Sequence, residues 1–413
     1  MLSSKPIYLY ITPFFPSSRT WQGGFCLDAV RAIRADGRYE VVVMTATDYG
    51  GDYEYDGFKI YQLPRKRIGC SEYFETLLKR RNNQVFLAKL AEVGIRTEDV
   101  AVCHVHDFEH YVQYALALKK ISPKCLTLVH HHYAGYYRLA IGKLGIVPIW
   151  SDLLYLKMRR EFESVDAHVF ISKHCMSKYG HCVEFDTGVD RGLLQNQLFL
   201  GRCYRSINLP GGYVLYNGVD RSVFNEGADG ARCRSETDNS LVIGCVANFN
   251  PCKRQIDLIK AVEIVRRAVP DVKLKLLGTG LTRATCEAYV DEHDLRTVVE
   301  FIEPVPHDQL PGFYRSLDLF VMPSVNEGFC CVNVEANACG VPFMAVKGLP
   351  MDEVLANEDY DRWLFAPRDV EGLARMIIDF ARCRYEQNLV VDLDANHLVR
   401  QFCDWIKEKR IGL

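Results

Sequence analysis

The sequence predicts an α/β protein made of two Rossmann-like domains, each a doubly wound parallel sheet. The chain has 413 residues, which is more than one hydrophobic core usually organises. Short apolar runs alternate with segments of helical spacing, a pattern typical of a parallel sheet covered by helices. The alternation stops at a polar stretch, residues 225–240, and then starts again. These observations favour two domains of similar size.

The positions of the expected strands and helices follow from the individual apolar runs and the segments between them. In the front half the apolar runs that read as buried strands are IYLYITPF (7–14), EVVVMTA (40–46), VAVCHVHD (100–107), CLTLVHH (125–131), AHVFISK (167–173) and YVLYNGV (213–219). Segments 23–35 and 109–120 have helical spacing. The later strands are LVIGCVAN (241–248), DVKLKLLGTG (271–280), VVEFIEP (298–304), LDLFVMPS (317–324) and VPFMAVKG (341–348). We expect an N-terminal domain at 1–225, a C-terminal domain at 240–395 and a helix at 396–413 that packs back on the first domain.

In such sheets ligands bind at the carboxyl ends of the strands. Two domains that face each other would therefore form a central cleft lined by the loops between strands and helices. We expect the chemistry of the protein to lie in those loops.

Composition indicates a soluble, cytoplasmic protein. The chain is 48% hydrophobic and 25% charged, and it contains neither a run of about 18 apolar residues nor an N-terminal stretch typical of a signal peptide. The 16 cysteines are scattered without Cys-x-x-Cys spacing. Since Cys103, Cys125 and Cys245 fall inside apolar runs, we expect buried, reduced thiols.

The charge is unevenly distributed although the net charge is only −2. Basic residues cluster in the front half at 64–67 (PRKR), 77–81 (LLKRR) and 156–160 (LKMRR). Such clusters can face an anionic membrane or an anionic substrate, although a solvated surface explains them more often. We take them as an indication of a weak, peripheral interaction with an anionic membrane, and we expect no nucleic-acid partner.

The stretch PSVNEGFCCVNVEANACGVP (323–342) contains the strongest candidate site. It reads as the loop after a strand followed by a helix that Gly340 caps. The helix N-terminus would attract an anion, and Gly328 would let a phosphate approach the backbone. Glu335 would reach back to the hydroxyls of a ligand's sugar, and Glu327 at the loop tip would contact the group beyond the phosphates. Alternatively, both glutamates are acids at an exposed helix start.

The spacing of Glu327 and Glu335 resembles the Glu-x7-Glu signature of the GT-B glycosyltransferases, especially the retaining enzymes of glycosyltransferase family 4. Further segments resemble family motifs along almost the whole chain. They are ITPFFP…GGF (11–25), VLYNGVDRSVF (214–224), LLGTG (276–280) and GLPMDEVL (348–355). The resemblance implies the GT-B fold and a nucleotide-diphosphate sugar donor, without a cofactor.

The resemblance also implies roles for individual residues of the second domain. Lys253 stands where the family's lysine contacts the donor diphosphate, and a fixed ammonium would stabilise the charge on that leaving group. Asn248 stands where the family usually has arginine, so either Arg254 takes over or the site depends on Lys253 and the helix N-terminus. The remaining donor-binding candidates are Gly278, Gly328, Phe329, Cys330 and Glu335.

In the first domain the resemblance points to a histidine at the end of the fourth apolar run. His130 matches the family's donor-sugar histidine best, and His131 is the next choice. His106 is a further candidate for the cleft, or it is a packed, hydrogen-bonded histidine. Adjacent residues on a strand point to opposite faces, so three consecutive histidines would not readily bind one metal. The Gly23–Gly24 loop would contact phosphate or admit the acceptor, or it is simply a tight turn.

Metal-independent transfer is the favoured chemistry. The Asp-x-Asp stretches at 359–361 and 392–394 follow no buried strand and read as solvated turns. No Gly-x-Gly-x-x-Gly follows either first strand, which argues against a dinucleotide oxidoreductase. We therefore predict a retaining glycosyltransferase with Glu327, His130 and Lys253 as catalytic residues, no bound metal, and a glycan or lipid-linked acceptor. The alternatives are a nucleotide-sugar epimerase of the same fold and a catalytically silent partner subunit.

Overall fold

The computed structural model of the chain consists of two compact units that are each α/β. It describes residues 5–13, 15–17, 23–45, 51–63, 75–106, 108–132, 160–161, 163–180, 212–227 and 240–411, with the backbone alone for 75–81, 108–110, 178–180 and 411. One unit contains residues up to Tyr216 together with Asn396–Leu413, and the other is Asn217–Ala395. The basic clusters at 64–67 and 156–159 and the side chains of 77–81 lie outside the described residues.

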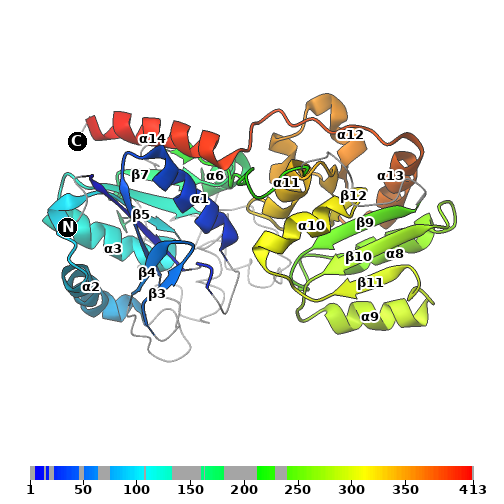
Figure 1. Cartoon of the computed structure of the whole chain (residues 1–413), viewed down its shortest axis with the longest axis horizontal. Coiled ribbons are helices and arrows are strands. Elements are labelled where there is room, and N and C mark those ends of the chain that lie inside the picture. The colour runs from blue at the N-terminus through cyan, green and yellow to red at the C-terminus, as the bar shows by residue number, and fades with distance from the viewer. Residues whose placement is uncertain are drawn as a thin grey trace, which may run out of the picture. The chain divides into compact units, whose positions relative to one another are not determined.

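The first unit is built on an eight-stranded sheet with the order β3-β4-β2-β1-β5-β6-β7-β8 (Figure 1). Its strands are β1 Ile7–Thr12, β2 Glu40–Thr45, β3 Tyr53–Tyr55, β4 Phe58–Gln62, β5 Val100–His106, β6 Leu126–His131, β7 Ala167–Phe170 and β8 Tyr213–Val214. The β3–β4 pair is antiparallel and the other pairs are parallel. The strands β1, β5 and β6 are buried along their whole length, as a parallel sheet covered on both faces requires.

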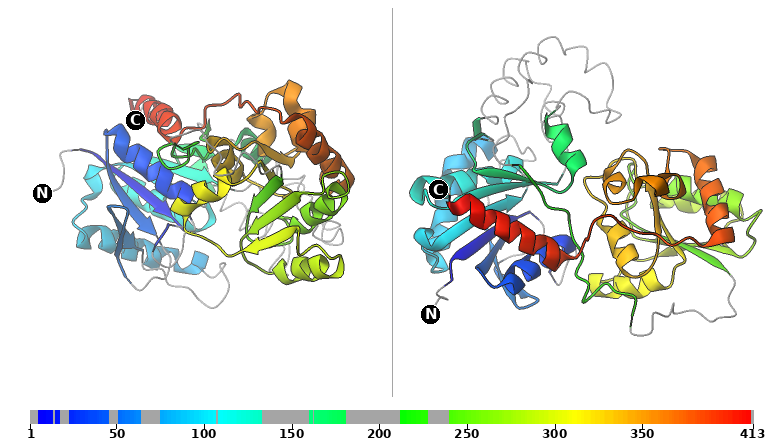
Figure 2. Two further views of the ribbon diagram at one scale, coloured as in Figure 1. Left: turned by 45° about the vertical axis from the view of Figure 1, so that its right-hand side comes forward. Right: turned by 90° about the horizontal axis from the view of Figure 1, so that it is seen from above.

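Helices cover both faces of this sheet. They are α1 Gly24–Asp36, α2 Glu75–Glu92, α3 Phe108–Ile121, α6 Lys173–Gly180 and α14 Ala395–Ile411, with a short 3-10 helix η2 Thr97–Asp99. Figures 1 and 2 show α14 lying across the first unit's sheet beside α1. Its Phe402 contacts Tyr213 with ring centroids 5.2 Å apart, and its Asp404 pairs with Arg38 at 2.6 Å. The last helix therefore completes the core of the first unit.

The second unit has a six-stranded sheet with the order β11-β10-β9-β12-β13-β14, and every pair in it is parallel. Its strands are β9 Leu241–Val246, β10 Val272–Leu277, β11 Val299–Ile302, β12 Leu319–Met322, β13 Phe343–Val346 and β14 Leu364–Phe365. In chain order this is the Rossmann arrangement 3-2-1-4-5-6, in which the direction of winding reverses between the first and fourth strands. The reversal here lies between β9 and β12.

The helices of the second unit form two groups. They are α8 Gln255–Val265, α9 Arg283–Glu292, α10 Leu310–Arg315, α11 Cys331–Ala338, α12 Tyr360–Trp363 and α13 Val370–Cys383, with 3-10 helices η4 His307–Gln309, η5 Pro350–Glu353 and η6 Asn357–Asp359. The helix α8 contacts α9 and α13, whereas α10 contacts α11 (Figure 1). The helix α11 is followed by Gly340 at φ 78°, whose amide donates to Asn337. This left-handed glycine ends the helix as predicted.

The chain enters and leaves the second unit at one place. The amide of Val219 donates to the carbonyl of Leu393 at 2.9 Å, and the amide of Ala395 donates to the carbonyl of Val219 at 3.0 Å. Gly218 lies so close to Ala395 that an added Cβ would be 2.6 Å from its Cα. The second unit begins at Asn217, whereas the sequence analysis expected the first domain to extend to residue 225.

The cysteines lie where the apolar runs predicted. Cys103, Cys125 and Cys245 are buried free thiols, and burial raises the pKa of Cys125 and of Cys245 to about 12. The prediction of buried, reduced thiols is confirmed for these residues.

Candidate active site

The candidate site lies at the switch point of the second unit's sheet, where the loops after β9 and β12 meet. The amide of Val325 donates to the carbonyl of Cys252 at 2.9 Å, and the hydroxyl of Ser324 donates to the same oxygen at 3.2 Å. Parallel sheets of this kind bind ligands at the carboxyl edge at such a reversal. The two loops that carry Lys253 and Glu327 are therefore held together at the expected place.

Lys253 and Glu327 form an ion pair. The Lys253 Nζ lies 2.5 Å from Glu327 Oε1, and the two side chains are 23% and 12% exposed. Burial is the largest single effect on the pKa of Lys253 and lowers it, but the Glu327 carboxylate together with Cys330 and Cys252 raises that pKa above its usual value. Lys253 is thus an ammonium at neutral pH. Its backbone is fixed as well, because its amide donates to the Asn250 side chain at 3.1 Å.

Glu335 is held by two side chains that the sequence analysis did not identify. Tyr314 donates its hydroxyl to Glu335 Oε2 at 2.6 Å, and His307 Nε2 lies 3.3 Å from Oε1. Glu335 is only 8% exposed. Burial and the adjacent carboxylate raise the pKa of Tyr314 well above its ordinary value, so the phenol remains a donor. Each carboxylate oxygen can accept more than one hydrogen bond, so a ligand hydroxyl can still bind there.

The sequence shows where these two partners lie along the chain, but not that they meet Glu335. His307 follows β11 and Tyr314 lies on α10, so both belong to the connection that leads from one strand to the next at the same edge of the sheet. Nothing in the sequence pattern shows that this connection lies against α11. The contact of Tyr314 with Glu335 arises only in the tertiary structure.

Residues 328–330 form the turn into α11. Gly328, Phe329 and Cys330 are all buried, and the Cys330 carbonyl accepts a bond from the Asn333 amide at 3.1 Å. The helix that begins here carries Glu335 on its second turn. The structure therefore places the predicted anion-binding turn and the predicted sugar-binding carboxylate on one continuous segment.

Gly278 and Gly280 allow two loops to lie in close contact. An added Cβ would be 2.1 Å from the Ala247 carbonyl oxygen at Gly278 and 2.4 Å from the Phe249 oxygen at Gly280. Both glycines have φ near +145°, a backbone conformation that favours glycine. Gly278 therefore supports the loop after β9, and the structure supplies a packing reason for the LLGTG motif.

Asn248 and Arg254 differ in their surroundings. Asn248 is exposed, and its carbonyl accepts a bond from Gln255 at 3.1 Å. Arg254 has a left-handed backbone at φ 54° and binds Asp257 through two hydrogen bonds of 2.8 and 2.7 Å. The charge of Arg254 is thus balanced by a carboxylate three residues away, whereas Lys253 pairs with the candidate catalytic Glu327 of the neighbouring loop.

The first-domain candidates lie on the first unit's sheet and its first loop. Gly23 has φ 91° at the start of α1, and its carbonyl accepts the amide of Cys26 at 2.9 Å, which is the tight-turn geometry. His130 and His106 are 3% and 2% exposed. His131 points to the opposite face and lies 3.0 Å from His168, so the alternation predicted for consecutive histidines is confirmed.

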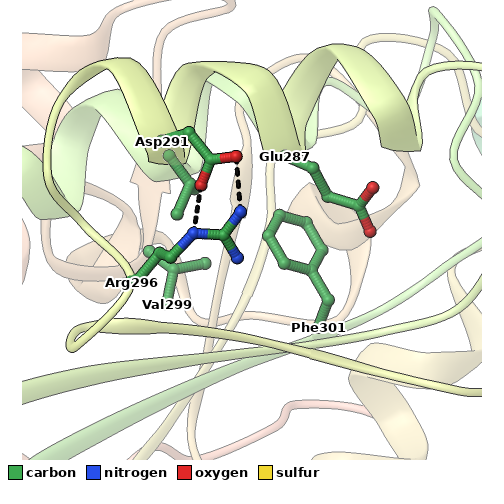
Figure 3. A pocket seen from close by; sticks show the side chains of 6 residues that line it. Glu287, Asp291, Arg296, Val299 and Phe301 are labelled. Atoms are coloured by element: carbon green, nitrogen blue, oxygen red, sulfur yellow. Dashed lines mark hydrogen bonds and ion pairs between the residues drawn. The ribbon is translucent and has the colours of Figure 1, made fainter.

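A surface pocket of about 360 Å³ lies elsewhere, between α9 and β11 (Figure 3). Its lining includes Glu287, Phe301 and the ion pair of Arg296 with Asp291. No residue that the sequence analysis selected lines it. The pocket therefore adds nothing to the candidate site at the switch point.

The comparison with known proteins begins with the second unit. Residues 233–396 match the sequence family described as glycosyl transferases group 1. An α-(1-6)-phosphatidylinositol monomannoside mannosyltransferase of Mycolicibacterium smegmatis, described as GDP-mannose-dependent, is 33% identical over 56% of this chain and 54% of its own length. A D-inositol 3-phosphate glycosyltransferase of Corynebacterium kroppenstedtii is 33% identical over 33% of this chain and 34% of its own. The chain thus aligns with about half or less of each relative.

Solved structures extend the comparison to the whole chain. HepE of Anabaena, crystallised with UDP and glucose, has a TM-score of 0.65 with 15% identity, covering 98% of this chain and 100% of HepE. The chain has the GT-B fold of glycosyltransferases. Sucrose-phosphate synthase of Thermosynechococcus elongatus has the same GT-B fold with a TM-score of 0.62 and 17% identity, covering 99% of this chain and 97% of its own. In the part of the chain that the structure describes, no helix of this GT-B protein is long and apolar enough to cross a membrane.

Proposed function

We propose that the chain is a retaining, metal-independent glycosyltransferase of family 4 that moves a sugar from a nucleotide-diphosphate donor to a glycan or lipid-linked acceptor. The observation that carries the proposal is the meeting of Lys253 and Glu327 at the switch point, beside the turn into the helix of Glu335. This arrangement sets a cation, two carboxylates and a helix N-terminus at one edge of the sheet. A donor diphosphate and its sugars require those groups.

In the proposed reaction the bond between the anomeric carbon and the diphosphate breaks as the acceptor oxygen bonds to that carbon. Lys253 leaves its ion pair in part to stabilise the negative charge on the departing diphosphate, together with the amides of the turn at 328–330. Glu335 accepts hydrogen bonds from the ribose hydroxyls while Tyr314 holds its orientation. Glu327 contacts the donor sugar. The leaving phosphate can take the acceptor's proton, so no side-chain base is required.

The relatives suggest a class of donor and acceptor. The two relatives are named for GDP-mannose and phosphatidylinositol in one case and for inositol 3-phosphate in the other, and HepE was crystallised with UDP. We therefore propose a UDP- or GDP-sugar donor and an acceptor that carries an anionic head group. An epimerase and a silent subunit are less well supported, because the named relatives are transferases and the Lys253–Glu327 pair is intact.

Ligand-induced stabilisation tests this function directly. We expect UDP or GDP, or one of their sugar derivatives, to raise the melting temperature, since a ligand at about 100 times its dissociation constant adds about 2.7 kcal/mol. The donor that binds should then be hydrolysed slowly by the isolated chain and faster with an acceptor. Stabilisation by none of a panel of nucleotide sugars would overturn the proposal. Conversion of the donor to an epimer without an acceptor would favour the epimerase.

The proposed acceptor-binding role of the first unit leads to a second test. The basic clusters at 64–67, 77–81 and 156–160 belong to the first unit, and we propose that they dock reversibly on anionic lipid at a cytoplasmic membrane surface. Each basic residue contributes only about 1 kcal/mol, so binding should disappear at high salt. Cosedimentation with anionic and neutral vesicles at two salt concentrations measures this. Equal binding to both vesicle types, or none to either, would favour a soluble acceptor.

A further inference from the structure

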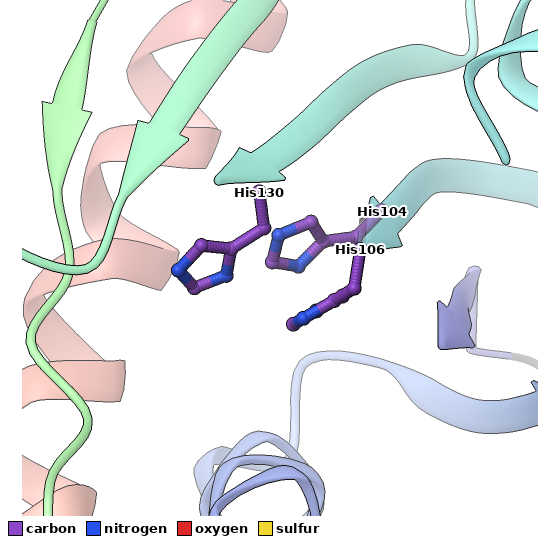
Figure 4. Close-up of side chains that lie close together, drawn as sticks. All are labelled: His104, His106 and His130. Atoms are coloured by element: carbon purple, nitrogen blue, oxygen red, sulfur yellow. The ribbon is translucent and has the colours of Figure 1, made fainter. Parts of the chain in front are cut away.

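A group of histidines lies on one face of the first unit's sheet. His104 and His106 are two residues apart on β5, and His130 on β6 pairs directly with His106, so all three side chains project from the same face (Figure 4). The ring centroids of His104 and His106 lie 4.5 Å apart, and those of His106 and His130 lie 4.7 Å apart. His132 adjoins the group, with its ring 4.5 Å from His130.

The hydrogen bonds of these rings leave a consistent set of nitrogens unused. His104 Nδ1 bonds the Tyr8 hydroxyl at 2.7 Å, and His106 Nδ1 bonds His132 Nε2 at 2.7 Å. The Nε2 atoms of His104 and His106 and both ring nitrogens of His130 are buried without a hydrogen-bond partner among the described residues. Buried polar atoms are normally satisfied, so several unsatisfied nitrogens in one place indicate a missing partner.

The chemistry of the group indicates which kind of partner it would bind. The three residues are only 1%, 2% and 3% exposed, so their free ring nitrogens are shielded from solvent. A neutral imidazole offers a lone pair on the ring nitrogen that carries no proton. The group contains imidazoles and no carboxylate. Imidazole suits Zn²⁺ and its neighbours in the first transition row, whereas Mg²⁺, Ca²⁺ and Mn²⁺ prefer oxygen ligands.

We propose that His104, His106 and His130 form a binding site for a late first-row divalent metal ion such as Zn²⁺. One nitrogen from each ring already lies within 4.8 Å of the others. Tetrahedral zinc with bonds of 2.0–2.1 Å to nitrogen needs them about 3.3 Å apart, so modest ring rotations complete the site. The fourth position remains for water or another ligand, as in zinc sites with three histidines.

The surrounding hydrogen bonds favour this arrangement. A metal-bound histidine usually donates its other ring N–H to an oxygen or nitrogen that fixes its tautomer. Tyr8 Oη can accept from His104 Nδ1–H, and His132 Nε2 can accept from His106 Nδ1–H, which leaves both Nε2 atoms free to bind the ion. Tyr8 is itself fully buried, so its hydroxyl is held in place.

The opposite face of the same sheet offers a control. His131 and His168 are also buried, but they bond each other at 3.0 Å and lie outside the group of three. A variant at His168 changes a buried histidine of the same unit without touching the proposed ligands. It therefore separates loss of the site from a general disturbance of the sheet.

The experiment measures metal binding on the full chain without an affinity tag, after treatment with EDTA. We expect one equivalent of Zn²⁺ by elemental analysis after dialysis, and a tetrahedral visible absorption spectrum on titration with Co²⁺. His104→Gln and His106→Gln should each lower Zn²⁺ affinity by at least about 100-fold, more than the loss of an outer hydrogen bond. His168→Gln should bind as the wild type does.

A second variant keeps the test decisive if a histidine variant does not fold. Tyr8→Phe removes only the oxygen that orients His104, and we expect about 10- to 100-fold weaker binding. Failure of the wild-type chain to bind Zn²⁺ or Co²⁺ stoichiometrically would overturn the proposal and leave buried water as the partner of these nitrogens. Equal affinity of the wild type and folded His104→Gln and His106→Gln variants would overturn it as well.

The metal proposal can be tested, and can be wrong, independently of the proposed transferase function on which the rest of the site argument depends. Metal content and the Co²⁺ spectrum do not require turnover, and the donor residues Lys253, Glu327 and Glu335 belong to the other unit. His130 is also the histidine to which the family resemblance assigns the donor sugar, so the metal test uses variants of His104 and His106 instead.

Discussion

The buried polar groups of the two sheets differ in whether they have a partner. At the switch point of the second sheet, Lys253 pairs with Glu327 and Tyr314 binds Glu335, so each charge has a partner within the same unit. On the face of the first sheet, imidazole nitrogens of His104 and His130 are buried without a hydrogen-bond partner among the described residues. Charges that are paired before a ligand arrives hold a site in shape, whereas unsatisfied nitrogens indicate a site whose partner is absent. The predictions below test the paired side of this contrast.

Removing the Lys253 ammonium should have the largest effect of the four changes. We expect Lys253→Ala to lower kcat by about 10²–10³, because charge on the leaving diphosphate is greatest in the transition state. Nucleotide affinity should fall less than turnover. The matched control is Arg254→Ala, whose guanidinium is bound to Asp257 and should matter less. If folded Lys253→Ala turns over as fast as the wild type, the role passes to Arg254.

Forcing apart the two loops of the second unit should destabilise it. Gly278→Ala places a Cβ 2.1 Å from a backbone oxygen at a positive φ, and neither atom can move without shifting the chain. We expect a loss of about 2–4 kcal/mol in the unfolding transition of this unit, measured by urea denaturation. Gly312→Ala meets nothing within 4 Å and should be neutral or slightly stabilising. Equal stability of the two variants would contradict the packing role of Gly278.

Weakening the carboxylate on α11 should reduce nucleotide binding. Glu335→Gln keeps the size of the side chain but removes the charge and one acceptor oxygen, so we expect donor and free nucleotide diphosphate to bind about 1.5–3 kcal/mol less tightly in calorimetry. Glu371→Gln is the control, since Glu371 is an exposed acid in the first turn of α13. Unchanged affinity in Glu335→Gln would rule out the ribose role and return Glu335 to an ordinary helix acid.

Removing the Tyr314 hydroxyl, which orients the Glu335 carboxylate, should have the smallest effect of the four changes. Tyr314→Phe removes the 2.6 Å bond to Glu335 but leaves His307 beside the other oxygen. We expect nucleotide affinity to fall by less than about tenfold, or 1.4 kcal/mol. Tyr289→Phe removes a similar 2.7 Å bond to Glu263 and should not change nucleotide affinity. A loss as large as that of Glu335→Gln would mean that Tyr314 contacts the ligand itself.

Much of the fold follows from local patterns. The buried runs at 7–14, 100–107 and 241–248 each became a central strand, because apolar side chains on both faces need a covered sheet. The run at 213–219 formed only the two-residue strand β8, since Asn217 onward joins the second unit. The β3–β4 hairpin was missed, although Asp56 and Gly57 supply a turn with positive φ.

The candidate site is only partly visible in the sequence. The loop motifs place Lys253, Glu327 and Glu335 after their strands, and the parallel topology brings those loops to one edge. The partners of Glu335 depend on how α10 lies against α11, which no local pattern encodes. The histidine group depends on the register that sets His106 opposite His130. In the sequence, the three consecutive histidines at 130–132 are the obvious group. In the structure, the histidines that lie together come from two strands, β5 and β6.

The return of α14 to the first unit has a consequence for biosynthesis. The ribosome makes the strands that carry His104 and His130 early, but Phe402, which lies against His104, comes only after the whole second unit. Domains generally fold as units during synthesis, with the earlier one first. Here the inserted unit can close on itself through Val219 and Ala395 before its host is complete. His104 then lacks its contact with Phe402 until the last helix docks, and the proposed metal ion has that interval in which to bind.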